Sequence, residues 1–176
     1  AGVPRVAVVD WDVHHGNGTQ DAFYEDDTVF YASVHQYPHY PGTGFPEERG
    51  ARETNLNVPV SRGAAPTLWV DAVRETIVPE LLRFGPEFLL ISCGFDGHRI
   101  DPLGNQRLEA EHFAAMTEAV RGLASGRVVS VLEGGYHLDA LAACAVAHIR
   151  ALQGRWAAVQ DAAEQTMRPR ARTRRE

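Results

Sequence analysis

Two acids and two histidines lie close together in the stretch DWDVHHGNG at residues 10–18, directly after the apolar run VAVV. On an extended backbone alternate side chains share a face, so Asp10, Asp12 and His14 would point the same way. A carboxylate and an imidazole on one face offer an oxygen and a nitrogen to a single cation, and Zn²⁺ accepts that mixture. Asp12 and His14 are therefore candidate metal ligands, with a polar turn or a helix cap as the alternative interpretation.

A catalytic zinc site uses three protein ligands and a water molecule, so a third ligand must come from another part of the chain. Asp96 is the best candidate because it lies between Gly94 and Gly97, where the backbone can turn and present a side chain closely. A simple Asx turn is the alternative there. His15 is interpreted as a buried, hydrogen-bonded support rather than a ligand. His39 lies in an aromatic loop and could line the mouth of a site, although a structural role is the favoured interpretation.

The elements that must position these residues alternate along the chain. Apolar runs predict strands, and spacings of three and four between apolar residues predict helices. Alternation of this kind indicates an α/β layer fold with a mainly parallel sheet, whose strands are mostly buried on both faces. The predicted strands are 5–10, 28–34, 88–94 and 127–133, and the predicted helices are 18–25, 66–84, 108–125 and 137–153. The stretch 35–65 is too long for a bare connection and is predicted to be a functional loop, in which LNVPV could add a short strand.

Polar residues follow all four predicted strands at their carboxyl ends, the edge at which open parallel sheets bind ligands. This convergence is the main argument from the residues alone for an active site. The clusters are Asp10, Asp12 and His14 after the first strand, Ser33 and His35 after the second, Asp96, His98 and Asp101 after the third, and Glu133, Tyr136 and His137 after the fourth.

Composition limits the classes of function. The net charge of −6 is uneven, because residues 168–176 (RPRARTRRE) carry five Arg and one Glu and the remainder carries 12 − 22 = −10. An acidic body argues against a nucleic-acid-binding core. No stretch approaches the length of a membrane span, no signal peptide is evident, and two distant cysteines favour a reducing compartment, so a cytoplasmic location is expected. One domain over 1–155 and a helical end with a disordered Arg-rich tail over 156–176 are predicted.

Four motifs together resemble the zinc-dependent histone deacetylase family, and their wording is nearest to its class II branch and bacterial relatives. The motifs are DWDVHHGNGTQDAFY, YASVHQYPHYPGTG, SCGFDGHRIDPLG and VLEGGYHLDAL, in the order of the family. The resemblance implies a three-layer arginase/deacetylase-like fold and zinc-dependent hydrolysis of an acetyl amide. The implied substrate is an acetylated lysine of a protein or a small acetylated amine.

Individual residues acquire roles through this resemblance. Asp12, His14 and Asp96 match the family's three zinc ligands. Asp10 and Ser33 match groups of a structural potassium site that backbone carbonyls complete, so Zn²⁺ and K⁺ are the implied cofactors.

The substrate-facing residues follow in the same way. Tyr136 matches the tyrosine that faces the substrate carbonyl, and Tyr40 falls where the family places an aromatic wall of the acyl-lysine tunnel. Leu103 stands where a polyamine-selective relative carries an acidic gatekeeper, which favours acetyl-lysine over an acetylpolyamine.

One departure from the family pattern is serious. The family's general base comes from a paired-histidine motif upstream of anything in this sequence, and the first strands of the family's sheet are missing too. The chain is therefore expected to be the C-terminal part of a deacetylase-like catalytic domain and inactive on its own. Three alternatives remain open: an acetylpolyamine amidohydrolase, a non-catalytic scaffold that binds acyl-lysine, and an arginase-like enzyme with two Mn²⁺ ions.

Overall fold

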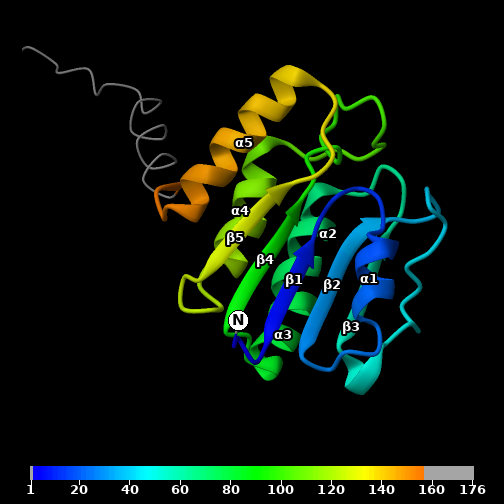
Figure 1. Ribbon diagram of the computed structural model, residues 1–176. Coiled ribbons are helices and arrows are strands. Elements are labelled where there is room, and N and C mark those ends of the chain that lie inside the picture. Colours follow the sequence, from blue (N-terminus) through cyan, green and yellow to red (C-terminus); the bar gives the residue numbers. More distant parts are fainter. Residues whose placement is uncertain (1, 157–176) are drawn as a thin grey trace, which may run out of the picture.

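Five parallel strands form the sheet of the computed structural model, which describes residues 2–156 (Figure 1). Their order across the sheet is β3-β2-β1-β4-β5. All four predicted strands are confirmed, and the LNVPV segment pairs with β2 as a fifth. The bounds are β1 Val6–Asp10, β2 Val29–Gln36, β3 Asn55–Val60, β4 Phe88–Cys93 and β5 Val128–Leu132.

The helices form where the apolar spacing predicts them. They are α1 Asn17–Phe23, α2 Pro66–Asp71, α3 Val78–Phe84, α4 Ala110–Val120 and α5 Leu138–Leu152, and a short 3-10 turn spans Ala51–Glu53. Between α2 and α3 the segment Ala72–Ile77 is a π-helix, so 66–84 is one modified helical run. Pro79 gives a physical reason, because its ring clashes with the carbonyl four residues earlier, at Glu75, and the wider π turn relieves that clash.

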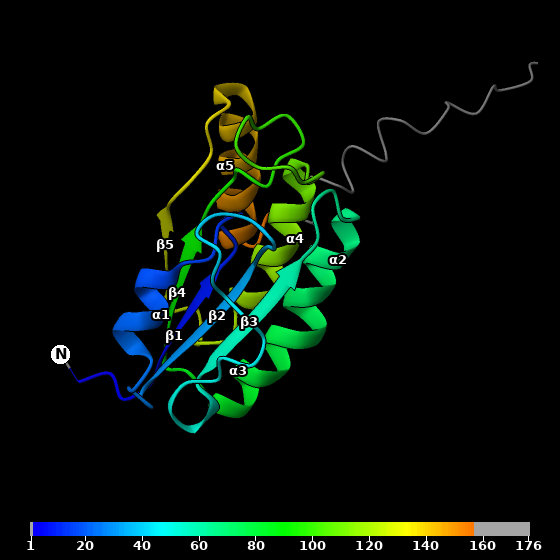
Figure 2. The ribbon, with the colours of Figure 1, turned by 90° about the vertical axis from the view of Figure 1, so that its right-hand side faces the viewer.

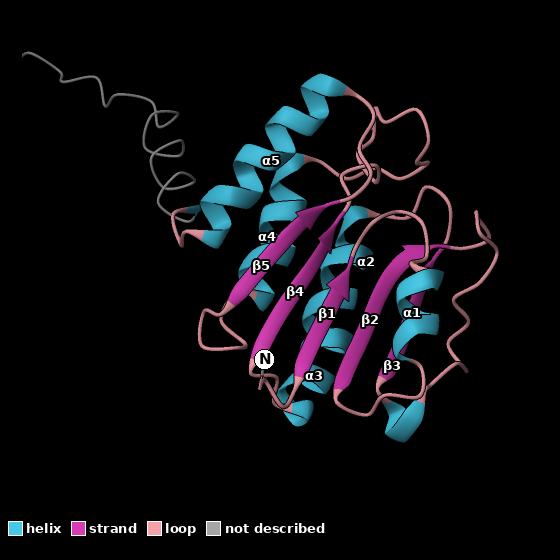
Figure 3. Ribbon diagram, viewed as in Figure 1, coloured by secondary structure: helices cyan, strands magenta, loops and turns pink. Residues whose placement is uncertain are grey.

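The sheet is the middle layer of the molecule. Helix α1 covers one face beside β2, whereas α2, α3 and α4 cover the other (Figures 2 and 3). Helix α5 packs on α4 through Ala114, Ala147 and Ala151. The predicted α/β fold with a mainly parallel sheet is therefore confirmed, and its core is built around fully buried Trp11 and Trp69.

The prediction that most strands are buried on both faces holds for only part of the sheet. Strands β1 and β2 are buried almost throughout. Strand β4 alternates between buried and half-buried residues, and β5 exposes Val129, Val131 and Leu132. Strand order alone does not explain this, because β3 is also an edge strand of the described sheet and is mostly buried. The difference follows from the covering helices, since α1 packs against β2 on its face of the sheet and does not extend over β4 and β5 (Figure 2).

Among the described helices, none has both the length and the apolar character needed to cross a bilayer. The predicted division of the chain at residue 155 stays a prediction, because all but the first residue of the 156–176 segment lies outside the described range.

Candidate metal centre and active site

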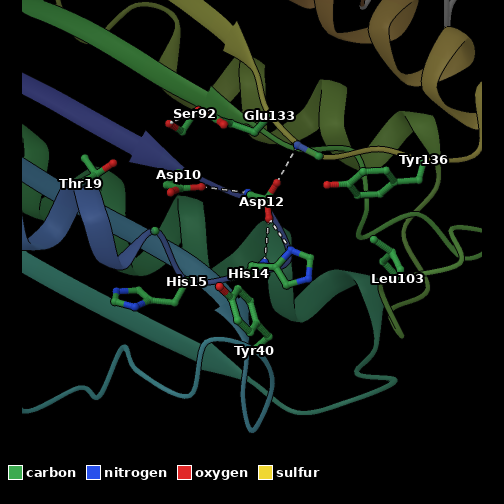
Figure 4. A pocket seen from close by; sticks show the side chains of 12 residues that line it. Asp10, Asp12, His14, His15, Thr19, Tyr40, Ser92, Leu103, Glu133 and Tyr136 are labelled. Atoms are coloured by element: carbon green, nitrogen blue, oxygen red, sulfur yellow. Dashed lines mark hydrogen bonds and ion pairs between the residues drawn. The ribbon is translucent and has the colours of Figure 1, made fainter.

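The carboxyl ends of the central strands lie level with one another and place their polar residues around one pocket. Asp10 at the end of β1 is in register with Ser33 on β2 and with Ser92 on β4. Beyond this level the chain forms a pocket of about 560 Å³ lined by 12 residues, among them Asp12, His14, Tyr40, Leu103, Glu133 and Tyr136 (Figure 4). The convergence predicted from the strand ends is thus present in part: residues after the first and fourth predicted strands line the pocket, whereas Ser33 and His35 lie within β2.

Asp12 and His14, which line this pocket, form a cluster with Asp96, which is fully buried beside them. Each offers one ligand atom, and the three atoms lie within 4.8 Å of one another. The Nδ1 atom of His14 lies 2.9 Å from Oδ1 of Asp12 and 3.1 Å from Oδ2 of Asp96. Two carboxylate oxygens and an imidazole nitrogen at this spacing match the donor set of a catalytic zinc site.

The electrostatics of the cluster also suit a cation. Oδ2 of Asp96 is buried and has no hydrogen-bond partner of proper geometry among the described residues. A buried carboxylate oxygen left in that state is costly unless a cation or donor satisfies it. The hydrogen bond to Asp12 and the close carboxylate of Asp96 raise the pKa of His14 to about 10, so a proton on the imidazole provides positive charge in the metal-free protein. A bound cation would take the place of that proton.

Backbone contacts hold the two carboxylates in position. The N–H of Val13 donates to Oδ1 of Asp96 at 2.9 Å, and the N–H of Gly134 donates to Oδ2 of Asp12 at 2.8 Å. Residue 134 must be glycine for this approach, because a Cβ there would collide with both carboxylates. The site thus combines the loops that follow β1, β4 and β5.

The two carboxyl groups differ in their pKa directions for physical reasons. Burial raises the pKa of Asp96, and the nearby Asp12 adds to that effect. Burial also opposes ionisation of Asp12, but hydrogen bonds from His14 and Gly134 outweigh it and hold the Asp12 pKa below its ordinary value. Asp12 is therefore the more acidic member of the pair.

Asp10 is buried just behind the cluster. Its carboxylate accepts hydrogen bonds from the N–H of Asp12 at 3.0 Å and from the Tyr31 hydroxyl at 3.0 Å. Burial nevertheless raises its pKa well above the ordinary value. Ser33, its register partner, lies 2.9 Å from Nδ1 of His35 through its hydroxyl oxygen. The structure therefore brings the two predicted potassium-site residues together, and the ion itself stays a prediction.

Two further histidines, His15 and His39, lie next to the cluster. The prediction for His15 is confirmed, because it is buried and hydrogen-bonds Thr43 at 2.8 Å and Gln20 at 3.1 Å. His39 lies against the cluster, which supports the alternative that it borders the site. Its ring stacks on His14 with centroids 4.9 Å apart and the planes 18° from parallel. Its place in the Pro-rich loop gave no periodic signal that could have assigned it to the site.

The three residues expected to meet substrate all line the mouth of the pocket. Tyr136 is 55% exposed, and in Figure 4 its hydroxyl points toward Asp12. Burial and the charges of Asp96 and Asp12 raise the pKa of Tyr136, which keeps its hydroxyl protonated. Tyr40 is 77% exposed with its ring edge-on to His14, centroids 6.1 Å apart. Leu103 is also exposed and lies across the pocket from Tyr40 (Figure 4).

Other strand-end residues from the predicted clusters are not drawn into the pocket lining. His98 lies 3.2 Å from Glu109, and the side chain of His137 caps α5. His35 is fully buried between Ser33 and the carbonyl of Gly44. In contrast, the pocket includes two residues that sequence reasoning did not single out, Thr19 on α1 and Ser92 on β4. Both are common polar residues inside regular elements, so only the tertiary arrangement reveals them.

Comparison with known proteins agrees with this geometry. The histone deacetylase domain family matches residues 1–152. The histone deacetylase-like amidohydrolase of Pseudomonas aeruginosa is 43% identical over 169 residues, which are 91% of this chain and 44% of that protein. A probable deacetylase of Archaeoglobus fulgidus is 41% identical over 145 residues, 78% of this chain and 40% of that protein.

Solved structures agree as well. The crystal structure of the HDA15 HD domain superposes with a TM-score of 0.82 at 39% identity, covering 87% of this chain and 45% of that one. The chain therefore spans less than half the length of the relatives it matches. With its sheet, its strand-end pocket and its sequence in agreement, this chain belongs to the histone deacetylase domain family.

Proposed function

We propose that this chain carries the metal-binding part of a deacetylase active site that hydrolyses the acetyl amide of acetyl-lysine. The observation that carries the proposal is the meeting of Asp12, His14 and Asp96 in one cluster, of which Asp12 and His14 line the same pocket as Tyr136. The family supports deacetylase chemistry in general, and the donor set supports a metal-dependent form of it.

Zn²⁺ is the proposed metal, held by one oxygen each of Asp12 and Asp96 and one nitrogen of His14. A bound Zn²⁺ would polarise the acetyl carbonyl and make a water molecule a better nucleophile at neutral pH. The three protein donors leave room for further ligands, as in catalytic rather than structural zinc sites. K⁺ is the proposed structural ion near Asp10 and Ser33.

Tyr136 is the proposed electrophilic residue. Its hydroxyl would donate a hydrogen bond to the oxygen that gains negative charge when the acetyl carbon becomes tetrahedral. A raised pKa suits this task, because the hydroxyl must stay protonated to donate. Removal of one such donor typically lowers kcat by about 10²–10³.

Tyr40 and Leu103 are proposed to flank the aliphatic part of the acyl-lysine side chain. Both are exposed at the pocket mouth, and an aromatic and an aliphatic group suit a methylene stem with a polar group only at its end. Neither carries a charge that would select a polyamine cation. The proposed substrate is therefore an acetylated lysine of a protein.

The general base is proposed to come from outside this chain. Among the described residues the pocket lining holds only two histidines, His14 and His15, and both already have partners. Burial lowers the pKa of His35 to about 4, and this residue does not line the pocket. Val129 and Val131 are exposed on β5 and alternate along the chain with Glu133, which lines the pocket, so their face of the sheet is a suitable place for further parts of the domain.

Turnover and binding assays test this proposal together. Zinc-loaded chain is mixed with an acetyl-lysine peptide, its unacetylated form and an acetylpolyamine, and binding and acetate release are both followed. We expect selective binding of the acetyl-lysine peptide with little or no acetate release, and release once the upstream half of a relative's domain is joined to the chain. Robust release by the 176-residue chain would place the base within it, and absence of any selective binding would contradict the proposed substrate.

A further inference from the structure

Asp101 joins the two loops that form one wall of the pocket. Its Oδ2 atom accepts a hydrogen bond from the backbone N–H of Tyr136 at 2.7 Å. Its Oδ1 atom accepts from the N–H of Leu103 at 2.9 Å and from that of Gly104 at 3.4 Å. The carboxylate is buried, with 7% of the residue exposed, and its own N–H donates to the carbonyl of His98. The Asp101 side chain therefore connects Leu103, at the pocket mouth, to the loop that carries Tyr136.

The neighbourhood of Tyr136 leaves few other restraints on its position. On its N-terminal side lies the pair Gly134 and Gly135, and Gly135 has a φ of 133°, in the region that glycine favours. On its C-terminal side α5 begins at Leu138. The Tyr136 side chain is 55% exposed, so packing does little to fix it. The hydrogen bond from its backbone to Asp101 is the contact that ties it to the opposite loop.

The other loop is held firmly against the metal cluster. A Cβ at Gly104 would collide with the backbone carbonyl of Asp96, so the 101–104 turn lies directly on the backbone of the third metal-ligand candidate. The N–H of Phe95 also donates to the carbonyl of Gly134 at 2.8 Å, which joins the same two loops a second time. Asp101 thus links Tyr136 to a segment whose position is set by the cluster itself.

We propose that Asp101 is a positioning residue that holds Tyr136 and Leu103 in fixed relation to the metal cluster. This inference rests on the proposed role of Tyr136 as the donor to the substrate carbonyl. Asp101 acts through the backbone of Tyr136 and touches no substrate. Both carboxylate oxygens are required, since one serves each loop. An amide in its place would keep one acceptor and turn an NH₂ group toward a backbone N–H.

The experiment compares Asp101→Asn, Tyr136→Phe and the double variant in the zinc-loaded chain. Amide hydrogen exchange is measured at residues 103, 104 and 136, zinc content by elemental analysis, and affinity for an acetyl-lysine peptide by titration. Asp71→Asn, at an exposed position outside the pocket, is the matched control. If Asp101→Asn fails to fold, Asp101→Ser serves instead, because its hydroxyl can hold the 101–104 turn but cannot reach Tyr136.

We expect Asp101→Asn to keep its zinc, to exchange the Tyr136 amide about tenfold faster or more, and to bind the peptide several-fold more weakly. In the double variant the loss of affinity should be smaller than the sum of the two single losses, because both changes remove the Tyr136 contact and only the share that acts through Leu103 adds. Additive losses, or unchanged exchange at Tyr136, would overturn the inference. If the unaltered chain fails to bind the peptide, the proposed function is contradicted, and the exchange measurement still decides whether Asp101 fixes Tyr136.

Discussion

Nδ1 of His14 lies 3.1 Å from Oδ2 of Asp96, although the two residues belong to loops that follow different strands. Strands β1 and β4 are hydrogen-bonded neighbours in the sheet, which is why their carboxyl ends present both side chains to one point. Every prediction about the metal centre depends on this approach.

Replacing Asp96 with Asn should remove most of the bound zinc. The change takes away a charged ligand but leaves an amide oxygen of the same size, so the fold should survive. Elemental analysis after dialysis measures the loss, and the thermal shift on adding zinc should shrink, since a ligand at 100 times its Kd stabilises by about 2.7 kcal/mol. Asp71→Asn should keep the zinc of the unaltered chain. Two equivalents of metal in the unaltered chain would favour the arginase-like alternative instead.

Gly134→Ala should weaken zinc binding although it replaces none of the proposed ligand residues. The added methyl group would meet the carboxylates of Asp12 and Asp96, which must then separate. Loss of support around a metal site typically lowers affinity by about 10–100-fold, and competition with a chelator measures it. Gly122→Ala is the control, because a Cβ there meets nothing within 4 Å. Equal affinities in the two variants would show that residue 134 does not shape the site.

Tyr136→Phe should lower kcat by about 10²–10³ in a protein that also contains the upstream half of the domain. The hydroxyl is lost while Asp12, His14 and Asp96 are unchanged, so zinc content should stay the same. Steady-state acetate release gives kcat, and elemental analysis gives the metal. Full activity with full zinc would remove Tyr136 from the mechanism.

Folding stability should fall as the pH drops from about 6.5 to about 4, in part because of His148. This residue is buried between the Thr117 and Ser130 hydroxyls, and burial lowers its pKa to about 4. The unfolded chain has the ordinary value of about 6.5, so it binds the extra proton first as the pH falls. The neutral imidazole therefore contributes stability that is present above pH 6.5 and lost toward pH 4, about 3 kcal/mol at most.

His148→Gln isolates this contribution, because Gln can keep polar contacts but does not titrate. Denaturant unfolding at several pH values should give a shallower loss of stability below pH 6.5 in the variant. The same slope in both proteins would show that His148 is not a source of the acid sensitivity.

Much of this protein follows from local sequence. The apolar runs determined the strands and their parallel pairing, because continuous Val, Ile and Leu segments separated by helices have few other ways to be buried. The residue types in DWDVHHGNG marked Asp12 and His14 as candidate ligands, although residues 12–14 form a bend beyond β1 and not the extended backbone that the alternation assumed. Polar residues after each strand foretold the edge at which the pocket lies.

The tertiary structure decided which residues from distant parts of the sequence contact one another. Only the strand order shows that β5 is an edge with exposed apolar residues. The stacking of His39 on His14 joins a Pro-rich loop to the metal cluster, and no periodic pattern could reveal it. The same is true of Asp101, whose carboxylate reaches the backbone of Tyr136 on another loop. Contacts between irregular loops depend on where the whole sheet places them, and residue type and spacing carry little information about that.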